Sequence, residues 1–136
     1  MTQDEAQLKA AAHWFRKADD ALASARAEST AGRYDFALNR AYYAAFYAAS
    51  AVLILRGQHF VKHTGLRASV HRTLVKGGVL DTRFGQIFDR LFDARQRADY
   101  LSLATVTPDD ALALISEAVD FVAQMKRLAP DASGPG

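Results

Sequence analysis

The sequence predicts an all-α protein, an antiparallel up-and-down bundle of four long helices plus one shorter helix. Apolar and small residues recur at helical spacing through most of the 136 residues, and no segment alternates as a half-buried strand would. Alanine is abundant and proline is absent before position 108, a composition that suits closely packed helices. Because the connections between the long amphipathic helices are short, we expect helices adjacent in sequence to run antiparallel.

The length of the chain fits one domain, which we expect to span residues 1–129, with a disordered tail over 130–136. The first helix should begin at a cap formed by Thr2 or Asp4 and reach about Thr30. The second carries small and apolar residues on more than one face, which predicts the most buried helix of the bundle. The remaining helices follow it at short intervals. In order, the second to fifth helices are expected over Tyr34–Arg56, Thr64–Val75, Thr82–Leu101 and Pro108–Leu128.

Local signals mark the ends of the later helices. Thr64 can cap the short helix, and the pair Gly77-Gly78 should stop it. Asp81 is placed to cap the helix that follows. Thr107 before Pro108 is typical of an N-cap residue followed by a proline in the first turn.

The charge of the chain is unevenly distributed, although the net charge is only +2. Residues 36–80 hold six Lys or Arg and no Asp or Glu, together with His59, His63 and His71. Such a basic segment favours an anionic ligand, a nucleic acid or an acidic partner surface. The alternative is a solvated basic face without a ligand.

Several classes of protein are excluded or disfavoured. The chain has no cysteine, which excludes disulfides, thiolate metal sites and cysteine nucleophiles. It has no phosphate-binding GxxxxGK[ST] or GxGxxG motif and no GxSxG nucleophile turn. The N-terminus does not resemble a signal peptide, and the longest apolar stretch is shorter than the ~20 residues that span a bilayer. We therefore expect a cytoplasmic protein that does not enter a membrane.

Neither a metal nor another cofactor is expected. His59 and His63 are spaced as in a helical zinc pair, but Phe60 stands where the HExxH motif has glutamate. No carboxylate occurs between Asp35 and Asp81, so the segment offers no third ligand.

Two short segments are candidates for anion binding. Lys62-His63-Thr64 places a cation, an imidazole and a hydroxyl directly before a helix that carries Arg67, so a helix N-terminus could add its free N–H groups. The alternative is that His63 bonds a loop carbonyl and Thr64 only caps. On the fourth helix, Arg95 continues the apolar stripe, and a guanidinium there needs a partner.

Asp99 lies four residues after Arg95 and is the expected partner in an ion pair on the same face. One interpretation is an arginine held in place to meet phosphate, because only arginine presents a planar, permanently charged fork. The other interpretation is a pair that only stabilises the helix or a subunit contact.

Three segments in order resemble the HEPN domain (higher eukaryote and prokaryote nucleotide-binding), in particular its small stand-alone prokaryotic members. The similarity covers about residues 8–128. Its three segments are Tyr34-Asp35 with Ala41-Tyr42-Tyr43-Ala44-Ala45-Phe46-Tyr47-Ala48-Ala49, then Lys62-His63-Thr64-Gly65, then Arg95-Gln-Arg-Ala-Asp-Tyr100.

The resemblance implies a helical bundle that forms a homodimer and is often paired with a minimal nucleotidyltransferase as toxin and antitoxin. Many active members are metal-independent ribonucleases with Arg-x4–6-His in the penultimate helix, and Arg95 matches the arginine of that motif. Tyr100 stands where histidine is expected. This departure puts ribonuclease activity in doubt, because a tyrosine with a pKa near ~10 is a poor base at neutral pH.

Three functions follow as hypotheses. The first is a nucleotide- or RNA-binding partner of a nucleotidyltransferase, with Lys62, His63, Thr64, Arg67, Arg95 and Asp99 as the binding residues. The second is a ribonuclease toxin in which Arg95 acts with Tyr100, or with a histidine from elsewhere such as His63. The third is a non-catalytic dimer whose basic segment docks an acidic partner.

Overall fold

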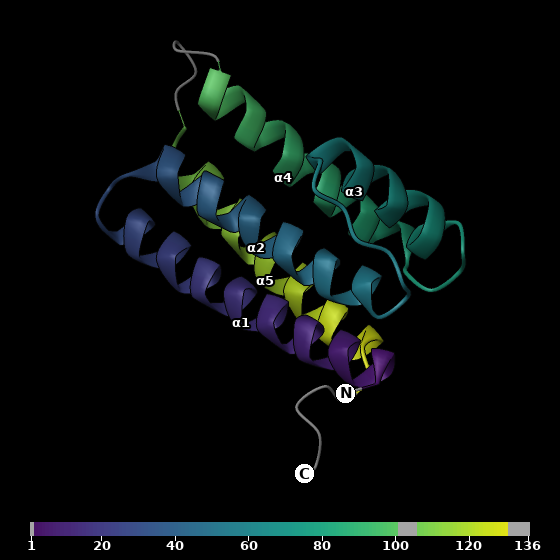
Figure 1. Cartoon of the computed structure of the whole chain (residues 1–136). Helices are drawn as coiled ribbons and strands as arrows, with labels where there is room; N and C mark the ends of the chain where they lie inside the picture. The colour runs from purple at the N-terminus through teal and green to yellow at the C-terminus, as the bar shows by residue number, and fades with distance from the viewer. Residues whose placement is uncertain (1, 101–105, 131–136) are drawn as a thin grey trace.

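The computed structural model describes residues 2–100 and 106–130; the side chain of Tyr100 and most of the tail expected at 130–136 lie outside this part. Within it the chain is helical and contains no strand, which confirms the predicted all-α bundle of four long helices and one shorter helix (Figure 1). The elements in order are α1 (Gln3–Thr30), α2 (Tyr34–Ile54), α3 (His63–Ser69), the π-helical segment η1 (Val70–Val75), α4 (Thr82–Tyr100) and α5 (Pro108–Leu128).

The helix α2 is the centre of the bundle. Figure 1 shows α1, α2 and α4 side by side, each antiparallel to the next, with α5 behind them and α3 packed beside α4. Thirteen residues of α2 are buried, many of them alanines such as Ala41, Ala45 and Ala48, and these small side chains let the neighbouring helices approach closely. The prediction that the second helix is the most buried is confirmed. None of the described helices is long and apolar enough to cross a membrane.

Side-chain caps begin three of the helices where the sequence predicts them. Thr2 Oγ1 accepts a hydrogen bond from the Glu5 backbone N–H (3.1 Å), and Thr107 Oγ1 accepts one from that of Asp110 (3.1 Å). Asp81 Oδ1 accepts a hydrogen bond from the Arg83 N–H (2.8 Å) at the start of α4. Each contact satisfies an N–H group that has no partner within its own helix.

Two predicted helix boundaries differ from the structure, and a third is not described. Helix α2 ends at Ile54 rather than Arg56, because the chain turns there and reaches Gly57 with φ of 78°. The end expected at Leu101 lies outside the described residues. The cap expected at Thr64 is wrong: α3 begins one residue earlier, at His63, so Thr64 already lies in its first turn, and Lys62 precedes the helix without a side-chain cap.

The short helix is also not α-helical throughout. After Ser69 it widens into the π-helical η1, where Lys76 N–H bonds to the His71 carbonyl five residues back (2.8 Å). Gly85 of α4 accommodates this segment: a Cβ there would lie 3.0 Å from Val75 Cγ2 and 3.1 Å from His71 Cε1. The small glycine therefore lets η1 pack closely against α4.

Candidate active site at the junction of α2, α3 and α4

Tyr42 of α2 is the residue around which the candidate site is built. Its side chain is completely buried, with its ring against Phe88 and Phe92 of α4 at centroid distances of 5.9 and 5.8 Å. Its hydroxyl shares a 2.7 Å hydrogen bond with Nδ1 of His63. Burial raises the pKa of the Tyr42 hydroxyl, so that group stays protonated at neutral pH.

His63 occupies the first turn of α3 and lies among aromatic rings. Its ring centroid is 4.6 Å from that of Phe46 and 5.6 Å from that of Tyr43. Burial lowers the pKa of His63, and the positive charge of Arg95 lowers it further. Its imidazole is therefore neutral at pH 7, able to accept a proton and to pack against the rings.

Arg95 of α4 is held between a carboxylate and two aromatic rings. Its Nε donates a hydrogen bond to Asp99 Oδ2 at 3.0 Å, which confirms the predicted ion pair. Its Cζ lies 5.2 Å from the Tyr42 ring centroid and 5.4 Å from that of Tyr43. The side chain is only 15% exposed. Arg95 and His63 therefore pack against the same two tyrosines, which brings a fixed cation close to a neutral imidazole.

Arg67 has a different environment. Its Nε donates a hydrogen bond to Asp89 Oδ1 (2.9 Å), its guanidinium lies 4.5 Å from the Phe92 ring, and His71 Nε2 bonds to the same Asp89 oxygen (2.8 Å). Part of the basic segment is thus compensated by an acid of α4. The sequence places that acid 22 residues after Arg67, and only the fold brings the two together.

The structure joins some of the predicted binding residues and separates others. His63 and Arg95 both pack against Tyr42 and Tyr43, and Asp99 joins them through its ion pair with Arg95. Arg67 is instead engaged by Asp89, and Lys62 and Thr64 are exposed at the start of α3. Tyr100 ends α4, and its side chain lies outside the described part. Among the described residues, no three His, Asp or Glu side chains lie close enough to hold a metal ion.

Sequence reasoning missed two residues of this site, Tyr42 and Tyr43. A signal was present: Tyr42 and Tyr43 are adjacent and are followed directly by the small and apolar run Ala44-Ala45-Phe46. A buried tyrosine hydroxyl usually needs a hydrogen-bond partner, so this pair predicts a polar neighbour.

The arrangement suits a phosphate-bearing ligand. Arg95 uses Nε for Asp99, and the described residues provide no hydrogen-bond acceptor for its two Nη groups, so these can donate to an anion. The neutral imidazole beside it adds a group that can bind or move a proton at physiological pH. The aromatic rings pack against both groups and hold them in place.

Comparison with known proteins gives a consistent assignment. The sequence model of the HEPN domain family matches residues 11–128. A "UPF0332 protein" of Thermotoga maritima is 33% identical over 119 residues, covering 88% of this chain and 90% of that protein. One of Archaeoglobus fulgidus is 30% identical and covers 90% of this chain and 94% of its own. A Methanocaldococcus jannaschii protein named "Putative toxin MJ0142" is 26% identical, over 83% of this chain and 77% of that protein.

Proposed function

Because the chain belongs to the HEPN domain family, we propose that it is a nucleotide- or RNA-binding protein of the toxin–antitoxin type, with Arg95 as its principal phosphate ligand. The toxin name carried by the Methanocaldococcus relative supports the biological class. The geometry of Arg95 is the single observation that carries the binding role. Asp99 and two tyrosine rings fix its guanidinium, so little conformational freedom is lost when phosphate binds.

Alanine at Arg95 is expected to weaken binding of labelled RNA roughly 10- to 150-fold, the equivalent of losing a charge-assisted hydrogen bond worth about 1.5–3 kcal/mol. Binding is measured in EDTA at several salt concentrations, because phosphate contacts make affinity fall with salt. Arg90→Ala is the matched control: Arg90 lies on the same helix but pairs with Glu117, away from the tyrosines. An equal loss of RNA affinity in the two variants would mean that binding depends on the overall positive charge and not on the position of Arg95.

A second candidate function, metal-independent RNA cleavage, is favoured by the position of His63. In this reaction the imidazole takes the proton of a 2′-hydroxyl, whose oxygen attacks the adjacent phosphorus and forms a 2′,3′-cyclic phosphate. The 5′-oxygen leaves and takes a proton from water, while Arg95 balances the charge on the phosphoryl oxygens. Donation from Nδ1 to the Tyr42 oxygen would leave the lone pair on Nε2, as a base requires. His63 would thereby replace the histidine absent at position 100.

If His63 is the base, the rate of RNA cleavage in EDTA should persist below pH ~6.5, the ordinary pKa of histidine, because the folded protein lowers the pKa of this group. His63→Gln should abolish cleavage and leave RNA binding largely intact. The pH profile of the single-turnover rate is the measurement. RNA cleavage by the His63→Gln variant would exclude His63 as the base and leave Tyr100 as the candidate.

The resemblance also supports a homodimer and a nucleotidyltransferase partner, and we include both in the proposal. Sedimentation of the purified chain measures the first. Co-purification of the chain with a co-expressed minimal nucleotidyltransferase measures the second.

A further inference from the structure

A strip of aromatic rings extends from the candidate site along the seam between α1 and α2. Tyr47 lies four residues after Tyr43 on α2, and their ring centroids are 5.7 Å apart. Trp14 of α1 stacks on Tyr47 at a centroid distance of 5.6 Å and an interplanar angle of 26°. We call Trp14, Tyr47 and Tyr43 the aromatic strip. All three rings are partly exposed while packing against the core.

Two cations lie on the strip. Lys17 Nζ is 5.1 Å from the Trp14 ring and 4.6 Å from the Tyr47 ring, and Arg40 Cζ is 5.2 Å from the Tyr43 ring. Among the described residues neither cation forms an ion pair with a carboxylate; Arg40 instead donates to Asn39 Oδ1 (3.0 Å). Neither cation is therefore held in a direct ion pair within the described part, and both can contact an anionic chain.

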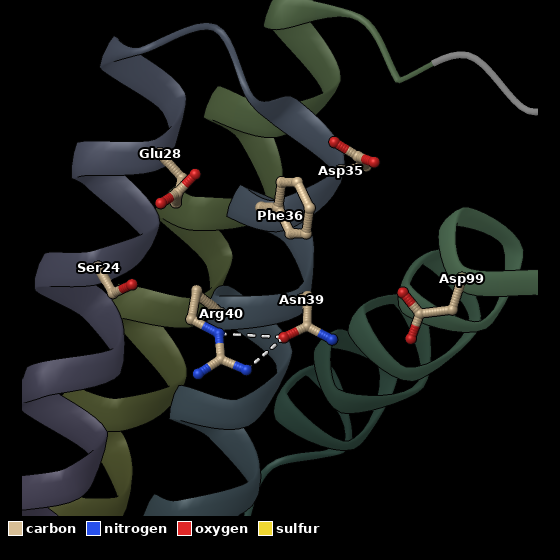
Figure 2. A pocket seen from close by; sticks show the side chains of 7 residues that line it. All are labelled: Ser24, Glu28, Asp35, Phe36, Asn39, Arg40 and Asp99. Carbon is tan, nitrogen blue, oxygen red and sulfur yellow. Dashed lines mark hydrogen bonds between the residues drawn. The ribbon is translucent and has the colours of Figure 1, made fainter.

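The strip is continuous with the Arg95 site, because Tyr43 contacts Arg40 and Arg95 alike. Beyond Arg40 the seam opens into a groove of about 320 Å³, which Figure 2 shows with Arg40 and Asn39 on α2 and Asp99 across the opening on α4. Phe36, which is 58% exposed, lines the same groove. The carboxylates of Glu28 and Asp35 also line this groove, so their negative charges disfavour a phosphate group there. The cations that an anionic strand could follow are therefore Arg95, Arg40 and Lys17.

We propose that the aromatic strip binds single-stranded nucleic acid, stacking the bases that flank the phosphate held by Arg95. The inference rests on the proposed function and adds the substrate class and the path that the strand follows over the surface. Aromatic rings interleaved with unpaired cations are the features with which proteins bind single strands, the rings stacking bases and the cations following the backbone. A protein partner fits less well, since lysine is depleted in the cores of protein interfaces.

Trp14 makes the proposal directly measurable, because it is the only tryptophan of the chain. Titration with an oligouridine of about ten nucleotides, within the ~4–16 nucleotides that single-strand sites commonly cover, should quench its fluorescence in step with binding. The dinucleotide UpU has a single phosphate between its nucleosides, and Tyr43 and Tyr47 lie between Arg95 and Trp14, so UpU bound at Arg95 should bind weakly without quenching. Trp14→Ala should weaken binding of the longer RNA roughly 5- to 150-fold and leave UpU unaffected.

A second variant guards against a folding defect in Trp14→Ala. Lys17→Gln keeps the tryptophan. It should lower the slope of log affinity against log salt concentration by about 1, the value for one lost phosphate contact. Its matched control is Arg16→Gln, an exposed neighbouring cation for which no ring contact is found among the described residues.

The outcomes separate this inference from the proposed function. In one outcome, RNA binding depends on Arg95, but Trp14 fluorescence is not quenched and Lys17→Gln binds RNA like Arg16→Gln. This result overturns the role of the aromatic strip and leaves the proposed function standing. Quenching that survives Arg95→Ala supports the strip and contradicts the role of Arg95. A change in dimerisation with Lys17→Gln, without a change in RNA affinity, overturns the strip in favour of a second copy of the chain.

Discussion

Replacing Tyr42 by alanine is expected to lower the free energy of unfolding by about 3–5 kcal/mol, the range for truncating a large buried aromatic side chain. The ring is fully buried and contacts both Phe88 and Phe92, so its removal leaves a cavity between α2 and α4. The same change removes the surface on which Arg95 rests and the hydrogen-bond partner of His63. Urea unfolding followed by circular dichroism measures the loss.

Tyr42→Phe is the control that separates packing from hydrogen bonding. It keeps the ring and deletes only the hydroxyl, so about 1 kcal/mol should be lost. The ring 15N chemical shifts of His63 in this variant report how far the hydroxyl holds the imidazole in one tautomer. A loss in Tyr42→Phe as large as that in Tyr42→Ala would contradict the central packing role of the ring.

Alanine in place of Gly77 should cost about 3 kcal/mol of stability, the upper part of the usual range for forcing extra volume into a packed site. A Cβ at this position would lie 2.1 Å from the Thr73 carbonyl oxygen and 3.2 Å from the Thr73 carbonyl carbon. That oxygen belongs to the backbone of η1, which cannot move aside as a flexible side chain does. The midpoint of urea unfolding measures the effect.

The adjacent Gly78 provides the comparison. It has φ of 77°, and a Cβ added there would have no neighbouring atom within 4 Å, so Gly78→Ala suffers only the left-handed backbone penalty, about 1–2 kcal/mol. Gly77→Ala should therefore unfold at a lower urea concentration than Gly78→Ala. The reverse order would show that the approach to Thr73 relaxes easily.

The fold was predictable because its determinants are local. Helical spacing, Thr2, Asp81 and the pair Thr107-Pro108 act within one or two turns, and the four long helices follow from them. The Arg95–Asp99 pair was predictable for the same reason, since residues four apart on a helix are neighbours.

The rest of the site depends on contacts between distant segments. Tyr42 meets His63 across 21 residues, and Arg67 meets Asp89 across 22, and no spacing rule connects such pairs. The hydrophobic periodicity also does not reveal the π-helical turn of η1, or that it packs closely against α4 at Gly85. The cap position expected at Thr64 lies at Lys62 instead, two residues earlier, which is within the usual uncertainty of helix boundaries.

Asp89 has a consequence for how the site moves. This carboxylate clamps Arg67 of α3 and His71 of η1 to α4, the helix that carries Arg95 six residues later. His63 lies on α3 and Arg95 on α4, so the contacts of Asp89 keep the helices that carry these two residues together. A phosphate group that binds at Arg95 would therefore find Arg95 and His63 already in position, without a preceding hinge movement.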